Sequence, residues 1–565
     1  MLDYEIDIDK GSHEPVIKTR LRSKALLSVP QLNKGSAFTN QERHALGLFG
    51  KLPKRVETIE EQAARAYFQL QNHGTRLQKY IFLNNLLDRN QVLYFKLLSE
   101  HLHELMPVVY TPTVSTAVKT FNKRFRQPRG LYLCYEDMDY MEEVLANRSN
   151  PDIQIIVVTD GEGVLGIGDY GISAMDIPIA KLAVYTALGG INPLHTLPIM
   201  LDVGTDNEEL LGDPMYLGWH SKRIRGKDYD EFVDKFVQLV KKHFPNAFLH
   251  WEDLGRNNAS RLLKHYRDDL CTFNDDVQGT GVVALAALLS AIAANQSTLA
   301  NQRIVIFGGG SAGLGIANSI YHAAIQEGLT ELEASRLFWI IDRDGLITQT
   351  SEGLTEAQSH FARHSDDICG WDKTLLQNVI EHVKPTILIG CSGCPNMFNE
   401  AVVTTMAKQV ERPIIMPLSN PTKLAEATPH DLLTWTNGKA RIATGSPFED
   451  CEFNGKKYVV SQCNNALIFP ALGLAVTAVN AKRMPDSVLY AAAKALASHS
   501  PISNHASESL LPEISTSKAF VKDMALEIAT KIVEEKLCEN FSAEQIKARI
   551  DALYWEPQYC KIEAV

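Results

Sequence analysis

The sequence predicts an α/β protein in which a helical N-terminal domain precedes two regions built on parallel sheets. From about residue 152 onward, short continuous runs of Val, Ile and Leu alternate with helical segments, a pattern typical of parallel strands covered on both faces. The first 130 residues instead carry apolar residues at helical spacing and few strand signals. At 565 residues the chain is too long for one hydrophobic core, so we expect several domains.

The expected domain boundaries are placed where the pattern of apolar residues changes between helical spacing and short continuous runs, because no internal repeat or low-complexity linker marks them. We expect a helical domain over 1–130, a parallel-sheet domain over 131–276 that is completed by 464–535, a second α/β domain over 277–463, and a helical tail over 536–565.

The composition argues against several classes of partner. The formal net charge is −11, and the 56 Lys and Arg residues are spread along the chain among 67 Asp and Glu, so no basic stripe is present to bind nucleic acid. The acidic start, MLDYEIDIDK, has the pattern of neither a secretory signal nor a transit peptide. The longest apolar run, 281–294, is too short to span a membrane and is expected to be a buried core helix. We therefore expect no membrane partner. Nine cysteines, an odd number, are typical of reduced thiols and predict a cytoplasmic protein.

Polar or glycine clusters directly follow the expected strands. Eight segments have this form: IQIIVVTDGEG, LPIMLDVGTDN, NAFLHWEDLG, RIVIFGGGSAG, RLFWIIDRDG, PTILIGCSG, RPIIMPLSNPT and RIATGSP. Open α/β sheets bind their ligands just beyond the carboxyl ends of the strands. We therefore expect these clusters to line one or two clefts.

A glycine-rich turn joins a strand to a helix in RIVIFGGGSAGLGIANSIYHA. Gly308, Gly310 and Gly313 follow the order GxGxxG. The first glycine permits a tight turn, the second lets the backbone approach a pyrophosphate, and the third lets the helix pack closely on the strand. This context predicts a Rossmann-type dinucleotide-binding domain with Ser311 and Ala312 also at the cofactor. The alternative is a glycine turn that binds nothing.

The next expected strand, LFWIID, ends in Asp342. A carboxylate at this position accepts hydrogen bonds from the ribose hydroxyls and repels a 2′-phosphate, so Asp342 favours NAD over NADP. The following residue, Arg343, could instead accommodate a phosphate, which leaves NADP open as the alternative.

Four acidic residues lie in two apolar contexts. HWEDLG places Glu252 and Asp253 at the end of a strand, and FNDDVQGTG places Asp275 and Asp276 just before an apolar helix. Carboxylates with little His or Cys nearby suit a hard cation such as Mg²⁺ or Mn²⁺. Helix capping is the alternative, and it explains one aspartate but not four acids.

Two further residues are candidates for proton transfer. Lys181 is the only charge in the apolar part of a predicted helix, so it either extends its amine to the surface or is desolvated with a lowered pKa that suits a general base. Without a visible partner, the first interpretation is favoured. Tyr110 lies between an apolar run and a Pro-marked turn, where most tyrosines serve packing.

Together these segments resemble the malic enzyme family along almost the whole chain. The matching segments occur in the order of the family: LNKGSAFTNQERHALGLFGKLP, VVYTPTV, TDGEGVLGIGD, LPIMLDVGTDN, HWEDLG, TFNDDVQGTG, the glycine loop, PLSNPT, ATGSPF and QCNNALIFPALGLAV. So many ordered matches make the resemblance specific.

The resemblance implies roles for individual residues. Tyr110 would be the general acid and Lys181 the general base, with Asp275 as a supporting catalytic neighbour. The implied metal ligands are Glu252, Asp253 and Asp276. The implied cofactor residues are Gly163, Asp276, the glycine-loop residues 308 and 310–313, Asp342 and Asn420. The implied substrate residues are Asn420 and Asn464.

The implied reaction is oxidative decarboxylation of (S)-malate to pyruvate and CO₂ by NAD with a divalent metal, and oxaloacetate decarboxylation is a plausible side activity. Lys181 would take the C2 hydroxyl proton as hydride leaves, and Tyr110 would later protonate carbon. The family's members are usually dimers or tetramers, so we expect a homodimer or homotetramer whose other partner is its small-molecule substrate.

One position departs from many family members, which carry arginine where this chain has Gly163. Some fungal malic enzymes and the malolactic enzymes are similar in having glycine there, so conversion of malate to lactate and CO₂ with retained NAD is the alternative. The malolactic sequences carry an acidic residue after the site tyrosine, whereas this chain has Thr111, as malic enzymes do. A catalytically inactive sensor on the same scaffold is not expected, because the implied catalytic and metal residues are all present.

Overall fold

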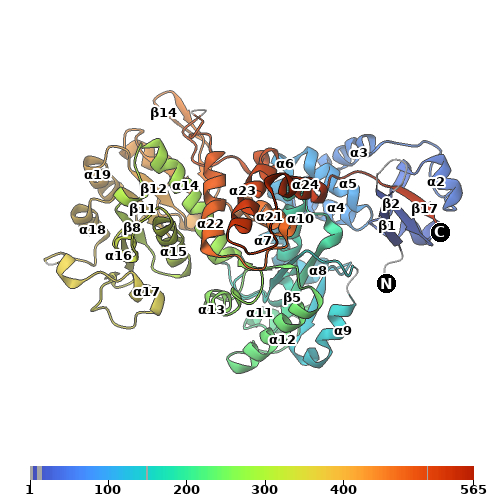
Figure 1. The fold of residues 1–565 in the computed structure, drawn as a ribbon, viewed down its shortest axis with the longest axis horizontal. Helices are drawn as coiled ribbons and strands as arrows, with labels where there is room; N and C mark the ends of the chain where they lie inside the picture. The colour runs from blue at the N-terminus through green and yellow to red at the C-terminus, as the bar shows by residue number, and fades with distance from the viewer. Residues whose placement is uncertain (1–3, 9–14, 148–149, 369, 505–506) are drawn as a thin grey trace. The chain divides into compact units, whose positions relative to one another are not determined.

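The computed structural model describes residues 4–8, 15–147, 150–368, 370–504 and 507–565 (Figure 1). The chain divides into two compact units. The first unit contains residues 1–255 together with 551–565, and the second contains residues 256–550. Each unit has its own parallel strands and its own hydrophobic core, so each is described in turn.

Short helices make up most of the N-terminal part of the first unit. Several begin with a capping box: Thr58 and Thr75 each accept a hydrogen bond from the third helical residue, whose side chain accepts one in return. The helices of this part are α1 (Ser23–Leu27), α2 (Asn40–Ala45), α3 (Ile59–Gln71), α4 (Arg76–Leu87), α5 (Gln91–Glu100), α6 (Leu102–Val109), α7 (Thr113–Lys119) and α8 (Phe121–Arg124). The helical character expected for this region is present.

A small sheet joins the two ends of the chain within the first unit. Strand β1 (Tyr4–Ile8) pairs antiparallel with β2 (Pro15–Thr19), and β17 (Lys561–Ala564) pairs parallel with β2. Side chains of these strands and of the segments that follow form a core of their own, with Ile17 and Ile562 buried in it. The sequence analysis did not anticipate these three strands.

Parallel strands form the centre of the first unit. They run in the order β3 (Leu131–Cys134), β5 (Thr196–Asp202), β4 (Ile155–Thr159) and β6 (Phe248–Trp251). All five residues of β4 and all four of β6 are buried, as continuous apolar strands require. The accompanying helices are α9 (Met141–Ala146), α10 (Asp176–Gly189), α11 (Glu208–Gly212) and α12 (Lys227–His243).

The second unit contains a seven-stranded sheet. Its order is β10 (Gly345–Leu346), β9 (Phe338–Asp342), β8 (Ile304–Phe307), β11 (Ile387–Gly390), β12 (Ile414–Pro417), β13 (Arg441–Thr444) and β16 (Ser461–Gln462). All neighbours are parallel except β9 and β10. The first strand in sequence, β8, lies between β9 and β11, so the strand order reverses beside it, which is the place where open α/β sheets bind ligands.

Helices cover both faces of this sheet. Figure 1 shows α18 and α19 on one side of β8, β11 and β12, and α14 and α15 on the other. Phe398, Val403 and Met406 pack against the strands on the α18 and α19 side. The main helices of the unit are α13 (Arg256–Tyr266), α14 (Thr280–Ala294), α15 (Ser311–Gln326), α16 (Glu331–Ser335), α17 (Glu356–His360), α18 (Leu376–Val383), α19 (Glu400–Gln409), α20 (Pro429–Trp435), α21 (Phe469–Val479), α22 (Asp486–Ser498), α23 (Val521–Glu534) and α24 (Ala543–Leu553).

Two helical segments of the described chain are long and apolar enough to cross a membrane, 171–189 and 275–294. In each, most of the apolar window is buried inside the protein, 94% and 72% respectively. The second segment contains the apolar run 281–294, whose expected role as a core helix is confirmed by the burial of α14.

Candidate active site

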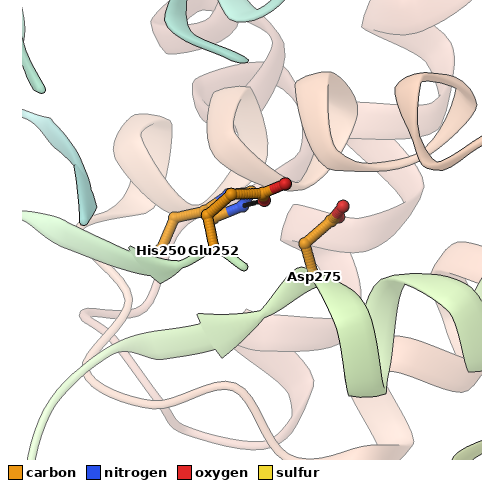
Figure 2. Close-up of side chains that lie close together, drawn as sticks. All are labelled: His250, Glu252 and Asp275. Atoms are coloured by element: carbon orange, nitrogen blue, oxygen red, sulfur yellow. Dashed lines mark hydrogen bonds and ion pairs between the residues drawn. The ribbon is translucent and has the colours of Figure 1, made fainter. Parts of the chain in front are cut away.

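The strand β6 delivers two carboxylates at its carboxyl end. Glu252 and Asp253 follow the strand directly and are only 2% and 3% exposed. Figure 2 shows His250 near the end of the strand and Glu252 just after it. Asp253 has a φ of 51°, in the left-handed region, where a residue other than glycine is strained. Strain of this kind concentrates at functional sites, so the conformation of Asp253 marks this turn as a candidate site.

Lys181 and Tyr110 lie beside Glu252. The side-chain nitrogen of Lys181, Nζ, is 3.2 Å from Oε1 of Glu252, and it lies 5.4 Å from the centroid of the Tyr110 ring. Lys181 is 2% exposed and Tyr110 is 7% exposed. The interpretation of Lys181 as a lysine that extends to the surface is therefore wrong, because the amine is buried against a carboxylate and an aromatic face. The structure brings the three residues together from α10, from the loop after β6 and from the residue that ends α6.

The sequence analysis missed the next residue of this cluster, His250. It is fully buried, its Nε2 lies 2.8 Å from Oε2 of Glu252, and its Nδ1 lies 2.8 Å from the hydroxyl of Tyr185. A histidine within the apolar strand FLHW was the one signal that could have revealed it, since an imidazole buried in a strand needs polar partners.

Gly163 lies against the backbone of the turn after β6. Its N–H donates to the carbonyl of Asp253 at 2.9 Å, and a Cβ at this position would lie 2.4 Å from the carbonyl oxygen of Leu254. A side chain at 163 would require this backbone to move. The glycine is thus built into the local packing of the loop.

The segment 160–169 that carries Gly163 is held at both ends by Arg223, which is buried. Arg223 donates to the carbonyl of Asp160 at 3.0 Å and to the carboxylate of Asp169 at 2.7 Å and 2.9 Å. Burial by itself would raise the pKa of Asp169, but the hydrogen bonds and charge of Arg223 outweigh it and hold that pKa below its usual value. Asp169 is therefore ionised at neutral pH.

The second pair of acids begins a π-helical turn, η5 (Asp275–Gly279), which follows β7 (Thr272–Asn274) and leads into α14. The capping alternative for these acids is wrong, because Asn274 is the capping residue and accepts a hydrogen bond from the N–H of Val277. Asp275, labelled in Figure 2, is 2% exposed, whereas Asp276 is half-buried.

Asp275 is held by a residue that the sequence analysis did not select. Asn465 donates from Nδ2 to Oδ2 of Asp275 at 2.8 Å and to its backbone carbonyl at 3.0 Å. Its neighbour Asn464, which the resemblance implied for the substrate, accepts from the N–H of Ala466 and begins a short helical turn. Because the two asparagines are adjacent, the sequence alone could not show which one holds Asp275 and which one begins the helical turn.

The glycine loop of the second unit has the geometry that a dinucleotide requires. Gly308 has a φ of 118°, which makes the tight turn after β8. A Cβ on Gly313 would lie 2.0 Å from the Gly308 carbonyl oxygen, so this glycine permits the close packing of α15 on the strand. A Cβ on Gly310 would meet nothing within 4 Å, which leaves its face of the loop open for a ligand at the start of α15, near Ser311 and Ala312.

Asp342 ends β9, the strand next to β8, and is half-buried. The side chain of Gln358 donates to Oδ2 of Asp342 at 2.8 Å and to the carbonyl of Gly309 at 3.1 Å. The carboxylate is thereby fixed beside the glycine loop, while Arg343 lies in an exposed turn.

Asn420 lies after β12 in the second unit. Its side-chain oxygen accepts a hydrogen bond from the hydroxyl of Ser446 at 2.5 Å, which ties it to the segment that follows β13. Asn420 therefore stands at the carboxyl edge of the same sheet as the glycine loop.

Comparison with known families accounts for this arrangement. Two family models match the chain: malic enzyme, N-terminal domain, over residues 87–267, and malic enzyme, NAD binding domain, over residues 277–536. The chain belongs to the malic enzyme family. The match to the malic enzyme N-terminal domain includes Tyr110, Lys181, Glu252 and Asp253, and the match to the NAD binding domain includes the glycine loop. Asp275 and the half-buried Asp276 fall in the short stretch between the two.

Individual malic enzymes are similar over nearly the full chain. The NAD-dependent malic enzyme of Idiomarina loihiensis is 46% identical over 538 residues, which cover 94% of this chain and 96% of the relative. The NAD-dependent malic enzyme of Sodalis glossinidius is also 46% identical, covering 94% of this chain and 95% of the relative.

Solved malic enzymes share the fold. The malic enzyme of Pyrococcus horikoshii has a TM-score of 0.54 at 20% identity and covers 80% of this chain and 89% of its own. The malic enzyme of Entamoeba histolytica has a TM-score of 0.55 at 18% identity and covers 90% of each chain. These likenesses confirm the predicted fold class of mixed helices and parallel sheets.

Proposed function

We propose that this chain catalyses the oxidative decarboxylation of (S)-malate to pyruvate and CO₂, with NAD as the hydride acceptor and a divalent cation as cofactor. The observation that carries the proposal is the buried cluster of Tyr110, Lys181 and Glu252 in a malic enzyme N-terminal domain. It is supported by the relatives named NAD-dependent malic enzyme, which are similar along nearly the whole chain.

Lys181 is the proposed general base. Its buried nitrogen takes the C2 hydroxyl proton of malate while the hydride on C2 passes to the nicotinamide, which leaves a keto acid. The C3–C4 bond then breaks, CO₂ departs, and its bonding electrons remain on the three-carbon product. Tyr110 donates its hydroxyl proton to C3 of that product and yields pyruvate. Burial of both residues keeps water from competing for these protons.

Glu252, Asp253 and Asp276 are the proposed ligands of the cation. The donor set fits Mg²⁺ or Mn²⁺, because these hard cations prefer carboxylate oxygens and two of the three carboxylates are buried. When bound, the cation supplies Lewis-acid stabilisation of the negative charge that develops as CO₂ leaves. Asp275, held by Asn465, supports this turn of the chain.

The glycine loop and Asp342 are the proposed determinants of NAD binding. The open face at Gly310 admits the pyrophosphate, and the fixed carboxylate of Asp342 accepts the ribose hydroxyls and disfavours a 2′-phosphate. We propose that Asn420 and Asn464 contact the substrate and that Asn420 also contacts the nicotinamide. Gly163 is proposed to lie beside the cofactor.

The enzyme is further proposed to be a cytoplasmic homodimer or homotetramer. Its cysteines support the location, because those that the structure describes are free thiols. Phe49 and Phe68, which are exposed in the first unit, are candidates for a subunit contact, because such a contact would remove their rings from water. Light scattering after size-exclusion chromatography measures the oligomeric state directly.

The proposal is tested with purified protein, L-malate, Mn²⁺ and either NAD or NADP. The absorbance of the reduced cofactor is measured over time. We expect it to rise with NAD, to stop rising when EDTA is added, and to rise again after Mn²⁺ is supplied in excess. A strong preference for NADP would contradict the role of Asp342, and full activity in EDTA would contradict the metal requirement.

A further inference from the structure

Both oxygens of the Glu252 carboxylate have partners within the first unit. Lys181 lies 3.2 Å from Oε1, and Nε2 of His250 lies 2.8 Å from Oε2. His250 and Tyr185 are fully buried, so the hydrogen bond from Tyr185 to His250 and the one from His250 to Glu252 are both shielded from water. The contacts therefore join α10 to the end of β6 in two ways: Lys181 meets Glu252 directly, and Tyr185 is connected to Glu252 through His250.

The partners of His250 determine which of its nitrogens bears the proton. Nδ1 lies 2.8 Å from the hydroxyl of Tyr185 and Nε2 lies 2.8 Å from the carboxylate. A carboxylate only accepts, so Nε2 must donate, and Nδ1 of the neutral ring must then accept the Tyr185 proton. Glu252 therefore fixes the tautomer, and Tyr185 satisfies the remaining nitrogen by donating to Nδ1. The Tyr185 ring packs edge-on against the imidazole at 5.7 Å between centroids.

We infer that His250, backed by Tyr185, is a positioning residue for Glu252. The inference rests on the proposed function, in which Glu252 is a metal ligand. The Nε2–H of His250 holds Oε2 and thereby fixes the rotation of the carboxylate about its last bond. Partners behind a ligand of this kind typically change metal affinity about 10-fold to 100-fold when removed, because the ligand is no longer held in the binding orientation.

The alternative is a histidine that only fills the core. A packing role requires a side chain of the right volume, whereas positioning requires an N–H at one place. His250→Gln and His250→Leu separate these requirements, since glutamine can present an N–H toward Glu252 and leucine cannot. Tyr185→Phe removes only the hydroxyl that donates to Nδ1 of His250 and holds the imidazole from behind.

The experiment measures the Kd for Mn²⁺ by the electron paramagnetic resonance signal of the free ion, with no substrate present. We expect His250→Leu to raise this Kd by about 10-fold to 100-fold, His250→Gln to recover most of the loss, and Tyr185→Phe to give a smaller increase of several-fold. The matched control is Tyr559→Phe, which removes a hydroxyl bonded to Asn90 and Gln62 in the same unit and is expected to leave the Kd within about twofold.

The outcomes distinguish this inference from the proposed function. If the wild-type protein binds Mn²⁺ and oxidises malate but His250→Leu binds Mn²⁺ equally well, the positioning role is wrong and the function stands. Affinity lost equally in His250→Gln and His250→Leu would also overturn it, because the imidazole itself would then be required. If His250→Leu does not fold, the Kd values of the other two variants decide. A Kd raised several-fold in Tyr185→Phe and nearly kept in His250→Gln supports the positioning role, and an unchanged Kd in Tyr185→Phe contradicts it. Wild-type protein that binds no Mn²⁺ would contradict the proposed function itself.

Discussion

Lys181 shows how a single residue changes its chemistry through its surroundings. On a predicted helix it is one cation in an apolar stretch, whereas in the folded chain its nitrogen is buried between a carboxylate and an aromatic ring. Burial disfavours the charged amine and the carboxylate favours it, and a base that must gain and release a proton benefits from such a balance.

Replacement of Lys181 by methionine tests its role directly. The substitution keeps the volume and the aliphatic stem and removes the base, so turnover is expected to fall by about 10²-fold to 10⁴-fold. The affinity for NAD, measured by fluorescence titration, should stay within about twofold, because the residue lies outside the dinucleotide-binding unit. Turnover close to that of the wild type would remove Lys181 from the mechanism.

The sequence could identify some site residues but not their partners. Glu252 and Asp253 could be selected because two acids end an apolar strand, and the family resemblance indicated Tyr110 and Lys181. The contact of Lys181 with Glu252 could not be predicted from the residues alone, since it joins positions 71 apart that only the packing of α10 on the sheet brings together. His250 was missed for the same reason.

At the scale of elements, the segment 160–169 depends on one buried arginine. Arg223 binds both ends of this segment, so hydrogen bonds hold the two ends of the loop that carries Gly163. The conformation of this loop matters because the N–H of Gly163 donates to the backbone carbonyl of Asp253, and the side chain of Asp253 is a proposed metal ligand.

Asp169→Asn is expected to lower the free energy of unfolding by about 3 kcal/mol at pH 7, because it removes the carboxylate that is hydrogen-bonded to the buried guanidinium of Arg223. The folded-state pKa of Asp169 is depressed, so its contribution is present above the unfolded pKa of about 3.9 and is lost as the pH falls through the lower folded value. Denaturant unfolding should therefore show a constant deficit from pH 7 to pH 5 that shrinks only below about pH 4. A deficit that already disappears near pH 6 would show that another group is responsible.

The glycine loop supports a paired prediction. Gly313→Ala should destabilise the fold and weaken NAD binding, because its Cβ would lie 2.0 Å from a backbone oxygen of Gly308. Gly310→Ala should unfold at nearly the wild-type temperature, since its Cβ meets nothing in the protein, yet bind NAD more weakly by about 10-fold or more, because the methyl group occupies the approach of the pyrophosphate. Equal NAD affinity in Gly310→Ala and the wild type would place the pyrophosphate elsewhere.

The elements that could be predicted are those with continuous apolar strands and glycine turns. All eight strand segments selected from the sequence form strands in the structure. The sheet of β1, β2 and β17 could not be predicted, because its strands are short, polar residues interrupt their apolar ones, and its last strand comes from the other end of the chain. Isolated short strands acquire their structure from such pairing rather than from their own sequence.

At the scale of the whole molecule, the two units divide the proposed chemistry. The first carries the proposed base, the proposed acid and two carboxylates, and the second carries the glycine loop and Asp342. The predicted family and fold class are confirmed by the comparisons, because many ordered motifs are matched along nearly the full chain.

The central claim is net oxidation of malate, and the ratio of products tests it most directly. Purified enzyme with L-malate, Mn²⁺ and NAD is followed for reduced cofactor by absorbance, while pyruvate and lactate are assayed in the same samples. The account predicts one reduced cofactor for each pyruvate and no lactate. Lactate without net reduced cofactor would contradict it, because it would mean that the hydride returns to the product and that Gly163 marks a malolactic enzyme.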